Sequence, residues 1–484
     1  MRCAAAGPRP GGTVNARAQQ GAALLIMMLI LILGVSAWLV RGLDARATAT
    51  AKQQQATAAL AAAKEALLGY MVTTEAAFPG SHGLLPCPDI DASGSFAEGQ
   101  AHDSACLARY RSVIGRFPWK TVGLAPARGS VGECLWYAVS GNWKAATLAT
   151  AELLNPDTNG QFRVLASDGR LVAGETPAAR AVAVIIAPGA PLAGQARASA
   201  GSGVEQCGGN YVAARYLDRD VATGTDNANL AAAPDAIDDF ITAEPGREDL
   251  NDQLVFVTRA EIEERLMRRA DIQARLGALT EAVAKCIANY GRTNPGGAAD
   301  RRLPWPAPMA LTQYRSDAAY DDASIGWLSG RVPDRVNDSS ARTGNALARV
   351  LGNCNAAAVP EWTPAMLALW RNWKDHLLYV VAGSFQPDAA PHSSCGSCLS
   401  VNGAGSHAAL VIFAGQRLAA LGQVRDQPPM DADTRAVAGN YLEGRNAANF
   451  PDATGDSDYQ SGAPAADFND VLYCIDVNLG VAAC

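Results

Sequence analysis

The chain has little histidine and lacks the common catalytic motifs. It contains five histidines in 484 residues, and neither a Gly-x-Ser-x-Gly elbow nor a His-Glu-x-x-His pair occurs. Asp375-His376 is the one pair that suggests a hydrolase, but it opens a predicted strand, where a role in the fold explains it better. We therefore expect a protein that is not an enzyme.

Positive charge is also in short supply. The chain has 40 Lys and Arg against 47 Asp and Glu, which gives a formal net charge of −7. Because phosphate binding needs a basic surface, this balance argues against nucleic acid as a main partner.

Cysteine, in contrast, is plentiful. Of 11 cysteines, Cys3 precedes the first apolar segment, and the other ten are spread through the chain. An even number behind an export signal predicts up to five disulfides in an oxidising periplasm, although spacing alone does not give their pairing. The ten candidates are Cys87, Cys106, Cys134, Cys207, Cys286, Cys354, Cys395, Cys398, Cys474 and Cys484.

Charge is absent from Ala22 to Val40, where Ser36 is the one hydroxyl residue. As a helix this segment is roughly 28 Å long at ~1.5 Å per residue, close to the ~30 Å hydrocarbon core of a bilayer. It predicts a membrane-spanning helix that continues into water as far as about residue 73. The expected location is the bacterial inner membrane, crossed once, with the remainder in the periplasm or at the cell surface.

The residues around this junction, from Arg17-Ala18-Gln19-Gln20-Gly21 to Ile26, resemble the cleavage site of type IV pilins and type II secretion pseudopilins. In that family a prepilin peptidase cuts after the Gly and methylates the new N-terminus. The resemblance therefore implies cleavage between Gly21 and Ala22. The family usually has Glu at the fifth mature position, where this chain has Ile26. That departure argues against a repeated major subunit and favours a minor subunit at the fibre tip.

Two other interpretations of the N-terminal segment stay open. It can be a plain signal anchor, or a secretory signal that is cut after Ala47-Thr48-Ala49, although its apolar core is long for a signal peptide.

The rest of the chain is predicted to be a head that is duplicated in tandem. The predicted fold class is α+β: a long membrane-spanning helix, then two copies of a helix with an antiparallel sheet of about three strands. The predicted domains are the leader 1–21, the helix 22–73, a first head 74–260 and a second head 261–484, led by a helix from Ala260 to Tyr290. Five pairs of segments recur in the same order: 116–119 with 302–305, 135–139 with 377–381, 183–187 with 410–414, 209–211 with 439–441, and 249–254 with 467–472.

Two clusters suggest metal binding. Asp89, Asp91 and Ser93, followed by Gly94, resemble the start of a Ca²⁺ loop, but the closing acid is missing, so an Asx-rich turn is the alternative. His392, Cys395, Cys398 and His407 have a spacing that suits zinc, but a periplasmic Cys-x-x-Cys is more often a disulfide. No cofactor other than this calcium is expected.

The sequence thus predicts a minor pilin or pseudopilin, a tip-like structural subunit of a type IV pilus or a type II secretion pseudopilus. Its expected partners are the prepilin peptidase, other pilin or pseudopilin subunits and the inner-membrane assembly platform. The alternative is a membrane-anchored periplasmic binding or adhesion protein that is not built into a fibre.

Overall fold

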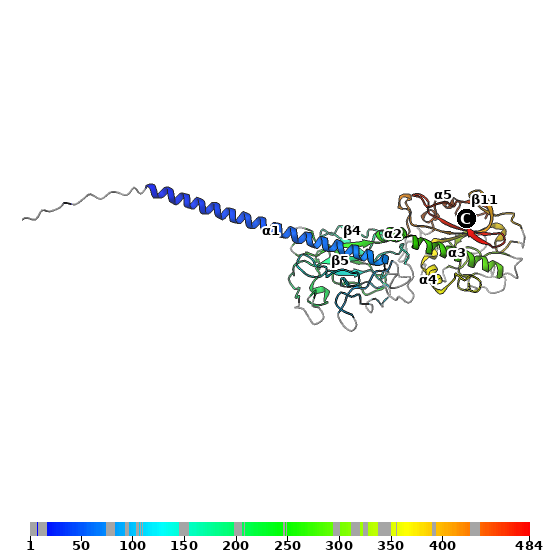
Figure 1. Cartoon of the computed structure of the whole chain (residues 1–484), viewed down its shortest axis with the longest axis horizontal. Helices are drawn as coiled ribbons and strands as arrows, with labels where there is room; N and C mark the ends of the chain where they lie inside the picture. Colours follow the sequence, from blue (N-terminus) through cyan, green and yellow to red (C-terminus); the bar gives the residue numbers. More distant parts are fainter. Residues whose placement is uncertain are drawn as a thin grey trace, which may run out of the picture.

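The computed structural model combines one very long helix with two mixed sheets (Figure 1). It describes residues 7, 17–73, 83–91, 96–102, 106, 108, 110–144, 154–197, 206–207, 209–244, 247, 249–293, 301–310, 320–322, 328–336, 350–354, 356–389, 394–425 and 436–484; within the first helix it describes side chains at 24–36 and from 50 onward.

The first helix, α1, runs from Arg17 to Thr73. It contains no proline, and its second half is rich in alanine, the best helix former. Figure 1 shows its N-terminal part projecting from the body of the molecule. Its C-terminal part packs on β5 and β7 through an apolar stripe that includes Leu60, Leu67 and Met71.

The predicted membrane-spanning helix is not supported. Within the part of the chain that the structure describes, no helix is both long and apolar enough to cross a membrane. The membrane-spanning part of the predicted fold class and the single-pass inner-membrane location are therefore wrong.

The first sheet has seven strands, and helix α1 covers one of its faces. Side chains alternate along β2 and β5: Tyr137 and Ile185 join the large core under the helices, while Trp136 and Ile186 join a smaller core on the opposite face. The strands are β1 (Val113–Arg116), β2 (Trp136–Val139), β3 (Phe162–Leu165), β4 (Leu171–Ala173), β5 (Ala181–Ala187), β6 (Asp238–Ile241) and β7 (Gln253–Thr258).

The second sheet also has seven strands and lies under α3, with α4 beside that helix. Its strands are β8 (Ser329–Arg331), β9 (Leu377–Val381), β10 (Leu399–Val401), β11 (Ala404–Phe413), β12 (Asp458–Tyr459), β13 (Val471–Asp476) and β14 (Val481–Ala483), and its helices are α3 (Ala270–Thr293), α4 (Pro364–Trp373) and the short α5 (Gly444–Ala448).

The predicted helix from Ala260 to Tyr290 is two helices. The first is α2 (Arg259–Met267), and the residue before it, Thr258, is its N-cap and forms a capping box with Glu261. The chain breaks before α3, where the Arg269 guanidinium donates to the carbonyl of Val72 in the last turn of α1. This bond ties the break to the first helix, and no Gly or Pro marks the break in the sequence.

The two sheets share one pairing scheme. In the first, β5 lies between β2 and β7, with Tyr137 opposite Ile185 and Ile185 opposite Val255. In the second, β11 lies between β9 and β13, with Tyr379 opposite Val411 and Val411 opposite Tyr473. Each sheet also contains one parallel pair, β3 with β6 and β10 with β12, so the expectations of a purely antiparallel sheet and of about three strands are wrong.

These registers correct three of the five predicted segment matches. Gly115 pairs with Tyr137 and Gly330 pairs with Tyr379, so Arg116 corresponds to Arg331 and not to Arg302. The Tyr137 hydroxyl donates to the carbonyl of Pro86, and the Tyr379 hydroxyl donates to the carbonyl of Pro304. Because Tyr137 and Tyr379 occupy the same place in their sheets, segment 302–305 corresponds to the region of Pro86. The match of 183–187 with 410–414 is displaced by one residue.

The third correction concerns 209–211 and 439–441. The short helices Ala213–Arg215 and Ala438–Asn440 are each followed by a tyrosine in the same place, Tyr216 and Tyr441. The segments that correspond in the structure share the pattern Val-Ala-x-x-Tyr-Leu, at 212–217 and 437–442, and the two Asn-Tyr pairs occupy different places.

Five disulfides are formed: Cys87–Cys106, Cys134–Cys207, Cys286–Cys354, Cys395–Cys398 and Cys474–Cys484. All ten predicted cysteines are therefore paired, each with a partner on its own side of α2. Cys3 lies outside the described residues.

Candidate functional site

The predicted calcium residues do not converge on one point. Asp89 is buried, and its Oδ2 accepts hydrogen bonds from the backbone N–H of Gly99 at 2.7 Å and from the Tyr211 hydroxyl at 3.3 Å. Burial raises the pKa of Asp89 to about 7. Asp91 instead lies 3.1 Å from Nε2 of His102, and Ser93 lies outside the described residues. The protein itself thus supplies the partners of Asp89, and the calcium site stays a prediction.

The predicted processing bond lies inside a helix. Gly21 and Ala22 both belong to α1, which begins at Arg17. A peptidase would therefore have to act on a locally unwound segment, because an extended backbone is needed to enter a cleavage site. Cleavage after Gly21 stays a prediction.

The predicted zinc cluster is divided. Cys395 and Cys398 are joined to each other, so neither offers the thiolate that zinc binds. His407 lies in a pocket on the second sheet, and His392 lies outside the described residues. The disulfide interpretation is the correct one for this pair.

Residues that the sequence did not connect meet where the two heads join. Nε2 of His376, just before β9, lies 2.8 Å from Oδ2 of Asp157 in the first head and 4.0 Å from Oδ2 of Asp375. Asn155 donates to Oδ1 of Asp375 at 3.0 Å. All four side chains are buried. In the described part of the chain this is the group of His, Cys and acidic residues whose geometry could hold a metal ion.

The charges around this junction favour an ion pair over a metal. Arg259 of α2 donates to the carbonyls of Asp157 and Arg425, and so links the two heads. Burial would raise the pKa of Asp157, but His376, Arg425 and Arg259 outweigh it and hold this pKa well below its usual range. Because two guanidinium groups already compensate the carboxylates, a cation would meet repulsion. The junction can therefore lock the heads together.

A second polar network occurs once in each head. In the first head, Asp218 and Asp252 form two reciprocal bonds: each carboxyl accepts a hydrogen bond from the backbone N–H of the other residue. The side-chain amide of Asn227 also donates to the carboxyl of Asp252. In the second, Glu443, Asp470 and Asn446 take these three places.

An arginine completes each of these networks. Arg197 donates to the carbonyl of Tyr216 and lies over its ring, and Arg425 does the same with Tyr441. Burial, followed by repulsion from Asp218, raises the pKa of Asp252 to about 8. Burial and the neighbouring Glu443 likewise raise the pKa of Asp470. Burial thus favours the protonated form of Asp252 in the first head and of Asp470 in the second.

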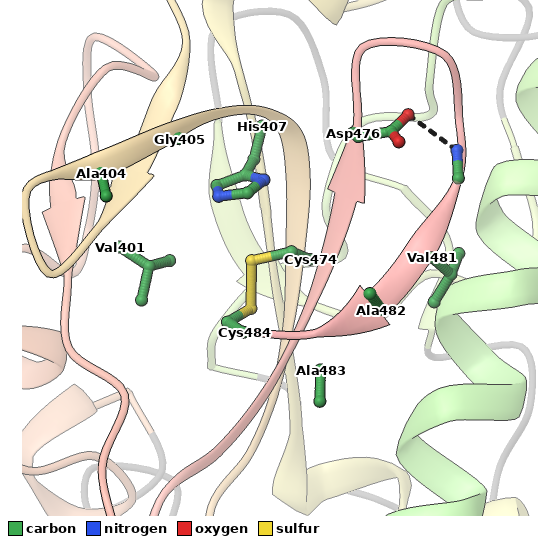
Figure 2. Close-up of a pocket in the computed structure, with 11 residues that line it drawn as sticks. Val401, Ala404, Gly405, His407, Cys474, Asp476, Val481, Ala482, Ala483 and Cys484 are labelled. Atoms are coloured by element: carbon green, nitrogen blue, oxygen red, sulfur yellow. Dashed lines mark hydrogen bonds between the residues drawn. A yellow bond between two sulfur atoms is a disulfide. The ribbon is translucent and has the colours of Figure 1, made fainter.

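The pocket in the second sheet has a volume of about 430 Å³. Figure 2 shows the His407 ring and the disulfide Cys474–Cys484 against it, with the Asp476 carboxylate bonded to a backbone N–H of the β13–β14 turn. Burial lowers the pKa of His407, which favours the neutral imidazole. The pocket thus offers a neutral imidazole and a carboxylate beside small apolar side chains. Its lining residues are Val401, Ala404, Gly405, His407, Cys474, Asp476, Gly480, Val481, Ala482, Ala483 and Cys484.

Sequence reasoning missed the junction because its two halves are far apart in the chain, with a separation of 220 residues between Asn155 and Asp375, and each half looked ordinary alone. Asp375-His376 was assigned to the fold, and the Asx-rich run 155–159 gives no sign of a partner in the other head. The available signal was the duplication itself: the buried His376 stands where the first head has Cys134, and a buried polar side chain needs a hydrogen-bond partner.

Comparison with protein-family models, with curated proteins and with solved structures finds no match for this chain. Fold and sites together define a two-headed α+β protein with a projecting helical arm.

Proposed function

We propose that this chain is a structural subunit of a pilin-like fibre, a minor pilin or pseudopilin at or near the tip. The observation that carries the proposal is the state of α1. Its C-terminal part is buried on the first sheet, whereas its projecting part presents a continuous run of large apolar side chains from Leu24 to Val35, each between 48% and 71% exposed.

Such a run needs a covering partner. Monomeric soluble proteins rarely expose contiguous apolar patches of this kind, and those that do use them for binding. The side chains project all around the helix and not along one stripe, as expected for a helix that is surrounded on every side. A bundle of like helices in a fibre core would supply this environment.

The position at the tip follows from the resemblance and from the bulk of the protein. The place of the family's usual Glu is taken by Ile26, which offers no ion-pair partner to the amine of a neighbouring subunit. Two heads on one helix would also crowd a thin fibre if every subunit carried them. The role that we propose is structural. The junction at Asp157 supports this role, because its ionisable groups are buried and are not exposed to a substrate in solution.

The test is the mature N-terminus, measured by intact mass and terminal sequencing after expression with and without a prepilin peptidase. The proposal predicts an N-methylated Ala22 that is found only when the peptidase is present. An uncut N-terminus under both conditions, or a start at Thr50, would contradict it.

One observation favours a second candidate. The pocket at His407 could bind a small ligand, as a binding or adhesion protein outside any fibre would. The membrane anchor that was expected for this alternative is not supported. Two results together would favour the second candidate: normal fibre assembly in a strain that lacks this chain, and a small ligand that binds in the pocket at His407.

A further inference from the structure

The two sheets differ at one edge. Strand β13 of the second sheet is paired on both sides, with β11 and with β14. Its counterpart β7 pairs with β5, and within the described residues no strand lies along its other edge. Alternate N–H and C=O groups of β7 must therefore point to a side where no strand accepts them.

This edge carries no charge and no proline of its own, although its ladder with β5 has one irregularity, between Ala181 and Ala183. Natural proteins shield edge strands with charges, proline, irregular pairing or a covering segment. The sequence of β7 is Gln-Leu-Val-Phe-Val-Thr, with no charge and no proline. Five of its six residues are only partly buried, among them Leu254 and Phe256. An uncharged, apolar edge of this kind is suited to pairing with another strand.

The second head shows which kind of strand fits beside an edge like that of β7. Beside β13, the place is taken by β14, a short antiparallel strand of small residues, Val481 to Ala483. It is held by the disulfide between Cys474 and Cys484. The residue that corresponds to Cys474 in the first head is Phe256, since Ile185 and Val411 face Val255 and Tyr473. The first head therefore lacks both the strand and the cysteine that would fasten it.

The helices complete this comparison. Helix α3 packs on β11, β13 and β14, while α1 packs on β5 and β7. In the second head, the helix thus forms a wall against which the added strand lies. In the first head α1 offers the same wall beside β7, and no described strand lies against it.

We propose that the free edge of β7 binds an extended, apolar strand of another protein chain, which adds antiparallel to the sheet in the place that β14 takes in the second head. Backbone hydrogen bonds would provide the affinity, and α1 would favour small side chains on the inner face of the incoming strand. The inference does not depend on membership of a fibre, because any partner with such a segment can bind.

The test uses the full chain and a peptide of residues 478–484, which contains β14 and Cys484. A Phe256→Cys variant restores the cysteine that the first head lacks, and the peptide cysteine carries a thionitrobenzoate group. The introduced thiolate attacks the peptide sulfur, the mixed disulfide forms, and thionitrobenzoate leaves with the electron pair, so its absorbance reports the rate. Val212→Cys, at an exposed position elsewhere in the first head, is the matched control, and Cys3→Ser is introduced in both variants.

Strand addition predicts that Phe256→Cys reacts about tenfold faster than Val212→Cys, since a bound strand raises the local concentration of its sulfur. Proline in place of Ala482 in the peptide should abolish the advantage. Equal rates for the two variants, or no effect of proline, would overturn the proposal.

A second measurement needs no new cysteine. In the unaltered chain, the same peptide with Ser for Cys484 should slow hydrogen exchange at the β7 amides, while the amides of β13 stay unchanged. Unchanged exchange at β7 with saturating peptide would also overturn the proposal, even if Phe256→Cys failed to fold. Neither measurement depends on cleavage at Gly21, so the result is separate from the test of the proposed function.

Discussion

The two heads use the same position before the first central strand in different ways. In the first head Cys134 occupies it and forms a disulfide with Cys207 in the same head. In the second head His376 occupies it and lies against Asp157 of the other head. The internal polar network with Asp252 or Asp470 is kept in both. The two heads thus share this polar network and differ at the junction and at the outer edge.

The largest effect is expected at the junction. Asp157→Ala removes the carboxylate that faces His376, Arg259 and Arg425, and should lower the free energy of unfolding by about 3–5 kcal/mol because buried positive charge is left uncompensated. Urea denaturation measures this change. Asp168→Ala, at an exposed position, is the control and should change stability by less than ~0.5 kcal/mol. A similar effect of both substitutions would contradict the role given to the junction.

The next largest effect is expected from the disulfides, which close loops of different length in the two heads. Cys134 and Cys207 are 73 residues apart, while Cys474 and Cys484 are 10 apart. From the entropy of the closed loop, replacing the first pair by Ser should cost about 4 kcal/mol, and replacing the second about 3 kcal/mol. Thermal unfolding of both double variants checks the order. The reverse order would show that loop entropy does not govern these bonds.

The carboxyl pairs give the heads a common pH dependence. The pKa of Asp252 rises from 3.8 to about 8 on folding, so the folded state binds more protons between these values. Its contribution to stability is full below about pH 4 and is lost as the pH rises towards about 8. Asp252→Asn imitates the protonated acid and should flatten this loss, with a gain on the order of 2 kcal/mol at pH 9.

Asp470→Asn is the matched test in the second head, where the direction of the pKa change is the same. Urea midpoints measured from pH 5 to pH 9 compare both variants with the unaltered chain. A steeper loss of stability at high pH in either variant would contradict the raised pKa of the acid that it replaces.

The smallest effect is expected from calcium. Asp89 already accepts hydrogen bonds from Gly99 and Tyr211, so Ca²⁺ would have to displace protein donors. Millimolar Ca²⁺ should therefore shift the unfolding free energy by less than ~0.5 kcal/mol, and Asp91→Asn should leave the response unchanged. A larger shift that Asp91→Asn abolishes would restore the predicted site.

Much of the fold could be predicted because it depends on local patterns. The apolar runs at 135–139 and 377–381 correspond to central strands, and the Asp-x-Asn-Asp segments before β7 and β13 mark the same turn. The pairing of 116–119 with 302–305 failed because two Arg-x-Pro-Trp segments look alike although one follows β1 and the other precedes the second sheet. Only the strand register, which depends on contacts between distant residues, separates them.

The membrane-spanning helix failed for another reason. Its prediction rested on the apolar length of one segment, whereas no helix in the described part of the chain is both long and apolar enough to cross a membrane. The site at His376 could not be predicted because Asp157 reaches it only through the packing of one head on the other. The edge of β7 became visible only when β14 showed what its counterpart carries.

The central claim is that the projecting part of α1 is covered by helices of other subunits. The most direct measurement places a photo-cross-linking amino acid at Ile30, 63% exposed, with the exposed Gln54 of the same helix as the control position. The account predicts cross-links from position 30 to other pilin-like subunits when the prepilin peptidase and assembly machinery are present, and none above the control without them. Cross-linking at position 30 that equals the control in both conditions would contradict it.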